Sequence, residues 1–411
     1  MAKSLTLKRS LSVPLVCLYG LGNILGAGVY VLIGKVAGEA GYFTPFSFLM
    51  ASVIAGITAF SFAELTSRYP VSAGEAVYIQ EGFGVKQLSL FVGLLIVLTG
   101  VVSSATIAKG FVGYLDVFIE LPSSLVIIVL LIVLGLVAVW GILESVSTAA
   151  LFTFIEIAGL ILILIVSFPE PGQLALHGAS FVPDLKLNSW IGISSGAFLA
   201  FYAYVGFEDM VNVAEEVKNP KRNLPIAILT ALGLATIMYV LVSVSALLVL
   251  SPEALGGSDA PLADVYAAAT GRNPWLITAV SLFAVVNGAL IQIIMASRVC
   301  YGLAKQSWLP EFLGEVNSKT QTPVNATAVL TAIIIVAALW LPIETLAATT
   351  TSLLLFVFTL VNIALVKIKR RHEPVANAFE VNILFPIVGA ILCGTFLSVH
   401  GFAQLVALFS G

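Results

Sequence analysis

A run of closely spaced glycines lies in the middle of the first long apolar stretch of the sequence, residues 11–37. It reads Gly22-Asn23-Ile24-Leu25-Gly26-Ala27-Gly28-Val29-Tyr30. Each glycine costs about 1 kcal/mol relative to alanine in a helix interior. Gly22 and Gly26 have the four-residue spacing that allows close packing of helices in a membrane. The alternative is a helix interrupted at mid-membrane, whose freed backbone groups bind a solute.

A second apolar stretch, residues 189–213, repeats this anomaly, because it carries small residues, Gly206 and two acids between Ser194 and Asp209. The interruptions fall in the first and sixth apolar spans, the spacing of two five-helix repeats with inverted topology. Such breaks bring half-helix ends together, where free N–H groups suit a carboxylate and free carbonyls suit an ammonium group. The two breaks together favour a site for an amino-acid zwitterion over a packing face.

Three charged residues, Lys109, Glu156 and Glu208, fall inside apolar spans. A charge at that depth costs about 2.5–3.5 kcal/mol on insertion scales, so such residues are candidates for gating or coupling. Glu208 lies just beyond the second interruption. Glu156 is a candidate proton carrier, because a carboxyl group buried without a partner tends to hold its proton near neutral pH. A buried Lys109–Glu156 pair is one hypothesis, and outward snorkelling of Lys109 is the alternative.

The composition identifies the class of protein. Of the 411 residues, 59% are hydrophobic and 10% are charged, whereas a soluble protein carries about 25% charged residues. We therefore expect an all-α polytopic membrane protein with the lipid bilayer as its surroundings. The net charge of −3 and the lack of a long basic run argue against binding of nucleic acid. Three cysteines and three histidines without metal-ligand spacing predict no metal site and no catalytic constellation.

Hydropathy predicts about eleven transmembrane helices within one domain spanning residues 1–411. The first repeat covers about 11–168, the second about 189–366, and an extra C-terminal helix about 382–400. A helical hairpin within 382–411 is possible in principle but would be cramped. The predicted spans are 11–37, 43–67, 86–117, 123–141, 147–168, 189–213, 225–250, 274–302, 323–342, 345–366 and 382–400.

The charges of the loops orient the predicted bundle. With the N-terminus inside, 15 of the 19 Lys and Arg residues fall on inner segments. This asymmetry follows the positive-inside rule and supports both the number of spans and a cytoplasmic N-terminus. We expect the protein in the cytoplasmic (inner) membrane of the cell, as a monomer or a homodimer.

Other polar residues have a structural and a functional interpretation. Glu64 and Arg68 are one helical turn apart, so an ion pair is favoured over a direct gating role. Asn287 and Gln292 could line the pocket for the substrate side chain or form hydrogen bonds between helices. Ser103, Ser104 and Ser352 are further candidates for that pocket. Because no second acid is clearly available for a cationic side chain, the sequence mildly favours a small or medium neutral amino acid.

Four motifs, in this order, resemble the amino acid–polyamine–organocation (APC) superfamily of secondary transporters, and the resemblance covers most of the chain. The first is the glycine-rich stretch Gly22–Tyr30. The second joins Ala63-Glu64-Leu65 and Arg68-Tyr69-Pro70 to Gly74-Glu75-Ala76-Val77-Tyr78. The third joins Gly206-Phe207-Glu208 to Ala214-Glu215-Glu216-Val217-Lys218-Asn219-Pro220. The fourth joins Ser297-Arg298 to Tyr301-Gly302-Leu303-Ala304, Trp308-Leu309-Pro310 and Thr322-Pro323.

The resemblance implies a five-plus-five inverted-repeat bundle, with helices 1 and 6 broken, that moves amino acids by alternating access. It implies that the backbone of Gly26, Ala27 and Gly28 holds the substrate carboxylate. The carbonyls of Ile24, Tyr202 and Val205 would take its ammonium group, and the Tyr202 ring would gate the occupied site. Some members of the superfamily carry a lysine in the fifth helix, where this chain has Glu156. That departure puts a lysine-based coupling mechanism in doubt.

These observations predict a transporter and not an enzyme, with no cofactor. We expect proton-coupled uptake of neutral amino acids, with the proton ranked above sodium as the coupling ion. An amino-acid exchanger is the alternative. An amino-acid sensor that binds without transport is a second alternative from another class.

Overall fold

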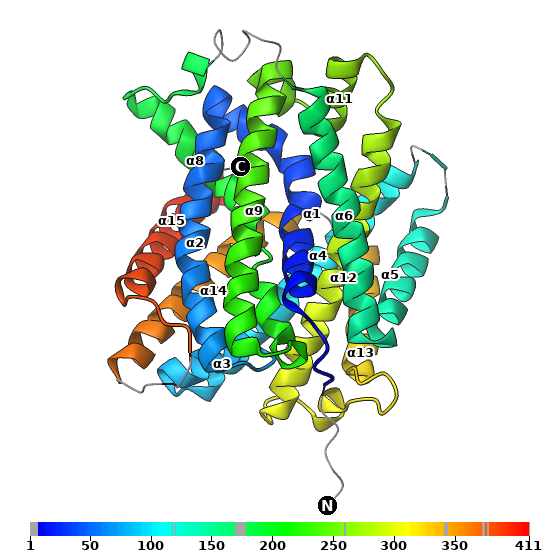
Figure 1. The fold of residues 1–411 in the computed structure, drawn as a ribbon, viewed down its shortest axis with the longest axis vertical. Helices are drawn as coiled ribbons and strands as arrows, with labels where there is room; N and C mark the ends of the chain where they lie inside the picture. Colours follow the sequence, from blue (N-terminus) through cyan, green and yellow to red (C-terminus); the bar gives the residue numbers. More distant parts are fainter. Residues whose placement is uncertain are drawn as a thin grey trace, which may run out of the picture.

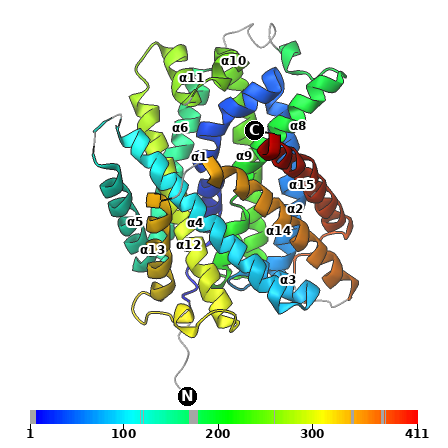
Figure 2. The same cartoon turned by 180° about the vertical axis from the view of Figure 1, so that it is seen from behind.

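The fold is an upright bundle of helices, seen from two sides in Figures 1 and 2. The structure is a computed structural model that describes residues 7–116, 118–119, 121–168, 178–258, 260–340, 344–371, 375 and 378–410. Within these residues, nine segments are long and apolar enough to cross a membrane, and two shorter apolar helices bring the spans to eleven. The expected all-α polytopic membrane fold is confirmed.

The long helices follow the predicted spans closely. They are α1 (Val13–Ala40), α2 (Thr44–Arg68), α4 (Lys86–Asp116), α5 (Ser123–Trp140), α6 (Ile142–Val166), α8 (Leu187–Tyr204), α9 (Pro220–Val249), α12 (Trp275–Lys305), α13 (Val324–Trp340), α14 (Glu344–Arg370) and α15 (Leu384–Ser410). Short helices connect them: η1 (Gly41–Phe43), α3 (Gly74–Phe83), η2 (Gly178–Phe181), η3 (Glu208–Glu216), α10 (Pro252–Gly256), α11 (Pro261–Thr270) and η4 (Glu311–Gly314).

Proline and glycine mark many of the helix ends. Pro220 and Pro261 lie in the first turns of α9 and α11, where the missing N–H group of proline is not needed. Gly41, Gly84 and Gly271 follow α1, α3 and α11 with positive φ angles. A residue without a side chain adopts this conformation at no steric cost. The ends of these helices are therefore encoded locally.

Corresponding helices of the two predicted repeats pack against one another. α1 contacts α8, α2 contacts α9, and α4 contacts α12. The short helix α3 follows α2 at one end of the bundle, whereas α10 and α11 follow α9 at the other end (Figures 1 and 2). This arrangement supports an inverted repeat, and the exact repeat boundaries stay a prediction.

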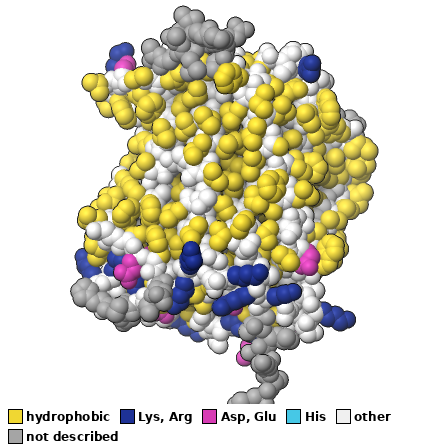
Figure 3. Space-filling model, in the orientation of Figure 1, with side chains coloured by type: hydrophobic (Ala, Val, Ile, Leu, Met, Phe, Trp, Pro, Cys, Tyr) yellow, Lys and Arg dark blue, Asp and Glu magenta, His cyan; other side chains and the backbone are white. Residues whose placement is uncertain are grey.

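The surface carries a broad hydrophobic belt with charged residues toward its ends. Figure 3 shows the belt on one face, with Lys and Arg side chains gathered toward the end of the molecule where α1 begins. We call this end the basic end; it carries the start of α1, the end of α2, α3 and the start of α9. Large apolar side chains such as Leu136 and Ile165, 63% and 66% exposed, face outward in the belt. Such a belt suits contact with lipid.

The C-terminal helix differs from the prediction. The sequence predicted a helix over about 382–400 and left a hairpin open for the remaining residues. Instead, α15 continues as one helix from Leu384 to Ser410, with no reversal in that range. The apolar residues beyond His400 extend the helix, because no proline or turn sequence interrupts them.

Candidate functional site

The first helix is interrupted at the predicted glycine. Gly26 has φ −32° and ψ −133°, whereas the rest of α1 is helical on both sides of it. A helix that begins after Gly26 has N–H groups in its first turn with no partner inside that half-helix. Gly26 and Gly28 therefore lie where backbone donors can face a bound anion. The side chain of Ala27 is outside the described part of the structure.

The sixth span is interrupted more completely. α8 ends at Tyr204, Val205 is extended at φ −60° and ψ 134°, and the chain continues after Phe207 as the 3₁₀ helix η3. Gly206 has φ +126°, a conformation that favours glycine. Its N–H group donates a 2.8 Å hydrogen bond to Oε2 of Glu208. Glu208 therefore accepts a hydrogen bond from the broken segment itself.

The two interruptions lie against each other. A Cβ atom placed on Gly28 would be 3.1 Å from Cα of Ala203 in α8. The side-chain amide of Asn23 in α1 donates to the carbonyl of Gly206 over 3.4 Å. Tyr239 of α9 joins both breaks, because its hydroxyl group lies within hydrogen-bonding distance of the Ile24 carbonyl and the Ala203 carbonyl. The four half-helix ends therefore form one polar region inside the bundle.

Two of the three carbonyls predicted to bind an ammonium group already have protein donors. The Ile24 carbonyl accepts from Tyr239, and the Tyr202 carbonyl accepts from the Val205 N–H group at 3.2 Å. A carbonyl oxygen has two lone pairs, so each can still accept a second donor. The side chain of Tyr202 is half-buried and lies beside Ser103 of α4. Its place next to the break is the one predicted for a gate, and the gating role itself stays a prediction.

Asn287 belongs to an interhelical network around Glu156. Its amide nitrogen donates to Oε1 of Glu156 over 2.8 Å and to Oγ1 of Thr153 over 3.1 Å, which joins α12 to α6. The carboxylate of Glu156 is fully buried, and its second oxygen, Oε2, has no hydrogen-bond partner among the described residues. The Tyr30 hydroxyl of α1 donates to the Glu156 backbone carbonyl over 2.9 Å. Asn287 and Glu156 therefore lie together where α1, α6 and α12 meet.

The Lys109–Glu156 pair that the sequence suggested is not formed in the described part of the structure. Lys109 lines a cavity of about 620 Å³ between α4, α5 and α13, together with Ser123, Ser124 and Ala338. Glu156 lies instead among α1, α6 and α12. Both residues lie on membrane-spanning helices. The sequence shows how far along its helix each one lies, but not which neighbouring helix its side chain faces.

Gln292 and Asp209 form a second polar network, beside the break in the sixth span. The Gln292 amide donates to Oδ2 of Asp209 over 2.7 Å, and the Asn23 amide donates to the same oxygen over 2.5 Å. Asp209 is 3% exposed, so this carboxylate is held by amides from α1 and α12 rather than by water. The sequence prediction chose Glu208 and passed over Asp209, although the two acids are adjacent in the chain.

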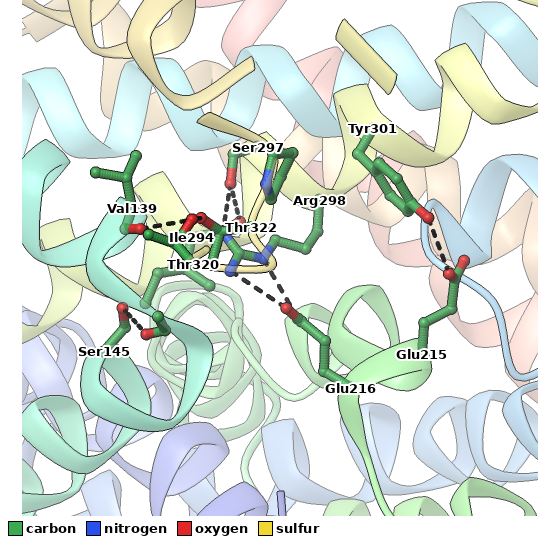
Figure 4. Close-up of polar contacts among 12 residues, drawn as sticks. Val139, Ser145, Glu215, Glu216, Ile294, Ser297, Arg298, Tyr301, Thr320 and Thr322 are labelled. Atoms are coloured by element: carbon green, nitrogen blue, oxygen red, sulfur yellow. Dashed lines mark hydrogen bonds and ion pairs between the residues drawn. The ribbon is translucent and has the colours of Figure 1, made fainter. Parts of the chain in front are cut away.

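Ion pairs and backbone contacts close the basic end. Arg298 of α12 contacts both carboxylate oxygens of Glu216 at 3.3 Å, and both side chains are fully buried. Beside this pair, the Tyr301 hydroxyl donates to Glu215 over 3.3 Å (Figure 4). Leu11, just before α1, forms a parallel bridge with Val217. Arg298 therefore joins α12 to the loop that follows the sixth span.

The predicted ion pair of Glu64 and Arg68 is also confirmed. The Arg68 guanidinium group contacts the Glu64 carboxylate at 2.7 Å, and Lys369 of α14 contacts the same carboxylate at 2.8 Å. The backbone N–H group of Val381 donates to Glu64 over 2.8 Å. Glu64 therefore ties α2 to α14 and to the segment before α15, which is a structural role.

A comparison with known protein families identifies the chain. The family model described as "Amino acid permease" matches residues 11–409. The chain belongs to this family of transport proteins. The match confirms the resemblance to the APC superfamily and the prediction that the chain is not an enzyme. It also confirms a multi-pass membrane protein with an APC-type fold.

Several relatives that are named as transporters are similar to this protein over much of the chain. The vacuolar cationic amino acid transporter 4 of Arabidopsis thaliana is 32% identical over 347 residues, 78% of this chain and 56% of the relative. A branched-chain amino acid permease of Bacillus subtilis is 26% identical, over 91% of this chain and 84% of the relative. A methylthioribose transporter of B. subtilis is 24% identical, over 96% and 89%. The chain spans about three-fifths of the length of the plant cationic transporters it matches.

Proposed function

We propose that the protein is a secondary transporter that moves an amino acid across a membrane by alternating access. The observation that carries this proposal is the meeting of two broken helices, at Gly26 and at Val205–Gly206. A site made of backbone N–H and carbonyl groups suits a zwitterion, which has both charges on one small framework. Relatives named for cationic and for branched-chain amino acids support this class of substrate.

For the substrate side chain we propose a small or medium neutral group. The acids nearest the breaks, Glu208 and Asp209, accept hydrogen bonds from Gly206, Asn23 and Gln292. These hydrogen bonds use one oxygen of each carboxylate to hold the broken segment together, which favours a structural role for both acids over contact with a cationic side chain. Ser104 of α4 and Ser352 of α14 have hydroxyl groups without a partner among the described residues, and they could contact a small polar substrate.

For the coupling ion we propose a proton, with Glu156 as its carrier. The Glu156 carboxylate has no basic partner in the described chain and one oxygen without a hydrogen bond. A sodium site near Ser297 has less support, because the Ser297 hydroxyl accepts a 2.9 Å hydrogen bond from the Arg298 guanidinium group. A second cation beside that group would be repelled. The basic end would face the cytoplasm, following the positive-inside rule.

Transport in proteoliposomes tests this proposal. A panel of radiolabelled amino acids is offered under an imposed pH gradient, an imposed sodium gradient, or neither. We expect neutral amino acids to accumulate only with the pH gradient. Accumulation without either gradient, but only against an internal amino acid, would identify an exchanger. Binding without movement would identify a sensor and overturn the proposal.

Glu156→Gln tests the carrier, and Glu144→Gln is its matched control. Both acids are on α6, but Glu144 is exposed at the first turn, whereas Glu156 is fully buried. We expect Glu156→Gln to remove accumulation driven by the pH gradient and to leave exchange of internal for external substrate. Glu144→Gln should keep both. Unchanged pH-driven accumulation in Glu156→Gln would remove this residue from the coupling path.

A further inference from the structure

Three buried acids lie between the break in the sixth span and the basic end. Glu208 and Asp209 belong to η3, and Glu75 belongs to the first turn of α3. Their exposed fractions are 1%, 3% and 1%. Within the described residues, no Lys or Arg forms an ion pair with any of the three. A buried carboxylate without a counter-charge is costly, so each needs hydrogen bonds or a proton.

Glu75 is the least satisfied of these acids. Its Oε1 accepts a 3.3 Å hydrogen bond from the Asn212 amide, whereas its Oε2 has no partner among the described residues. Asp209, in contrast, accepts from two amides at 2.5 and 2.7 Å. The hydroxyl groups of Ser72 and Tyr78, near Glu75 in the chain, likewise have no hydrogen-bond partner within the described part of the chain. The Glu75 carboxylate therefore has an oxygen available to hold a proton, and hydroxyl groups without described partners lie near it in the chain.

The groups around Glu75 disfavour its charge. Burial raises the pKa of Glu75 to about 8, against the lowering effect of backbone and Asn212 hydrogen bonds, and the charge of Asp209 adds to the increase. Of the cations on neighbouring segments, Arg370 of α14 is exposed, Lys305 of α12 lies over the Tyr301 ring, and four others are engaged elsewhere. Arg298 of α12 binds Glu216, Lys369 of α14 binds Glu64, Lys367 lies over the Phe83 ring, and Arg371 binds the Glu81 and Gly82 carbonyls.

Other polar and charged groups on the elements around Glu75 belong to α2, α3, α4, α12 and η3. Arg68 at the end of α2 contacts Glu64 and Glu380. Lys86 at the start of α4 donates to the Ser307 carbonyl, and Tyr301 of α12 donates to Glu215. The remaining titratable groups, Glu208, Asp209, Glu215 and Tyr78, are acids or a phenol. None of these contacts supplies a positive charge to the Glu75 carboxylate.

The surroundings of Glu75 exist because the basic end is closed. Asn212 of η3 accepts from the Gly74 N–H group over 3.1 Å and donates to Glu75, so it joins η3 to the start of α3. Glu215 of η3 accepts from the Ser72 N–H group over 3.0 Å. These contacts and the Arg298–Glu216 pair hold η3 against α3 and α12. Opening the basic end would separate them and admit water to Glu75.

We propose that closing the basic end assembles a proton-binding site at Glu75, so that the closed form takes up a proton from the compartment that this end faces. The proposal rests on alternating access but not on proton-coupled transport of the substrate. In the open form Glu75 is hydrated and has an ordinary pKa of about 4.3. Between about pH 4.3 and about pH 8, Glu75 is ionised in the open form and protonated in the closed form. Closing therefore binds a proton, and this favours the closed form over the open form. As pH rises through about 8, Glu75 ionises in the closed form and this advantage is lost.

Distance measurements between two spin labels test the proposal. Lys8, before α1, and Gln306, after α12, are both exposed. The labels are attached to the variants Lys8→Cys and Gln306→Cys in a protein whose native cysteines have been replaced. We expect the ratio of closed to open molecules to fall about tenfold between pH 7 and pH 9. In Glu75→Gln, which resembles the protonated acid, the ratio should stay at its neutral-pH value throughout. A full pH response in Glu75→Gln would overturn the proposal.

Glu81→Gln is the matched control, because Glu81 is on the same helix but exposed. It should keep the tenfold response. If Glu75→Gln does not fold, infrared titration of the unsubstituted protein provides a second test. One protonated carboxyl band should disappear with a midpoint near 8, in addition to any bands of other buried acids such as Glu156, and the absence of a carboxyl that titrates near 8 would overturn the proposal. If this test succeeds while substrate fails to follow the pH gradient in liposomes, only the proposed proton coupling of transport is wrong.

Discussion

The two helix breaks of this protein are built differently. At the break in the sixth span, Gly206 has a positive φ, and the side chain of Asn23 occupies the space where a Cβ atom would be. At the break in α1, Gly26 has a negative φ, and the nearest atom to an added Cβ is the Ala284 carbonyl oxygen at 3.7 Å. Gly206 is therefore constrained by its backbone conformation and by its neighbours, whereas Gly26 has neither a positive φ nor a close neighbour.

This difference indicates which half of the site can move. The sixth-span break is anchored by Asn23, Tyr239 and the Glu208 carboxylate, each through a hydrogen bond. At the α1 break, the hydrogen bond to a backbone carbonyl that the structure describes is the one that the Tyr239 hydroxyl donates to Ile24. We therefore expect α1 to bend more readily at Gly26 than the sixth span bends at Gly206. Three substitutions test this comparison, in order of decreasing expected effect.

Gly206→Ala should have the largest effect. An alanine there must adopt φ +126°, and its Cβ would lie 2.5 Å from Nδ2 of Asn23. A strained residue costs about 1–3 kcal/mol, and the collision adds to it. Thermal unfolding in detergent and equilibrium binding of substrate would measure the loss. Asn23→Ala alone removes the hydrogen bonds to Gly206 and Asp209, so it is the reference for the double variant. In that background Gly206→Ala should cost less stability, because the collision is gone and only the backbone strain remains. Full stability in the single variant would contradict the comparison.

Tyr239→Phe should have an intermediate effect. It removes the hydroxyl group that bridges the Ile24 and Ala203 carbonyls and keeps the ring that packs against Phe48 and Tyr204. Leaving buried carbonyls without a donor costs about 1–3 kcal/mol. We expect a lower melting temperature and weaker substrate binding. Tyr204→Phe is the control, because it removes a hydroxyl donor to the Phe48 carbonyl of α2 and leaves the donor to the Ile24 and Ala203 carbonyls in place, so it should leave binding unchanged.

Gly26→Ala should have the smallest steric effect on stability. The added methyl group would have ordinary van der Waals contact with the Ala284 carbonyl oxygen and no closer neighbour. We expect a melting temperature closer to that of the unsubstituted protein than for Gly206→Ala, with a change in the rate of transport as the main consequence. If Gly26→Ala were the more destabilising of the two, the α1 break would be the constrained one.

Much of the fold could be predicted from the sequence. The spans and both interruptions are local properties, because hydrophobic length and glycine content can be read along a single helix. The Glu64–Arg68 pair was predictable for the same reason, since four residues separate partners on one helical face. The pairing of Arg298 with Glu216 depends on more than local spacing, because α12 and η3 are far apart in the sequence.

The details of the site could not be predicted in this way. Asp209 was passed over because its partners, Asn23 and Gln292, lie on helices far apart in the sequence. Tyr239 carried no signal in the sequence, since it is one aromatic residue in an apolar helix. The Lys109–Glu156 pair was suggested by charge alone, and the rotation of α4 about its axis directs Lys109 toward α5 and α13.

The sequence by itself determined a membrane bundle with two broken helices, because a continuous apolar run must cross the bilayer and clustered glycines weaken a helix wherever they occur. Only the tertiary structure decided which groups form hydrogen bonds with the backbone atoms freed at the breaks. It also decided which buried acids have no ion pair among the described residues. Those outcomes depend on how each helix is rotated about its axis and on the depth in the membrane at which helices of the two repeats contact each other. In Glu75 and in Glu156, that packing leaves one carboxylate oxygen without a hydrogen-bond partner among the described residues.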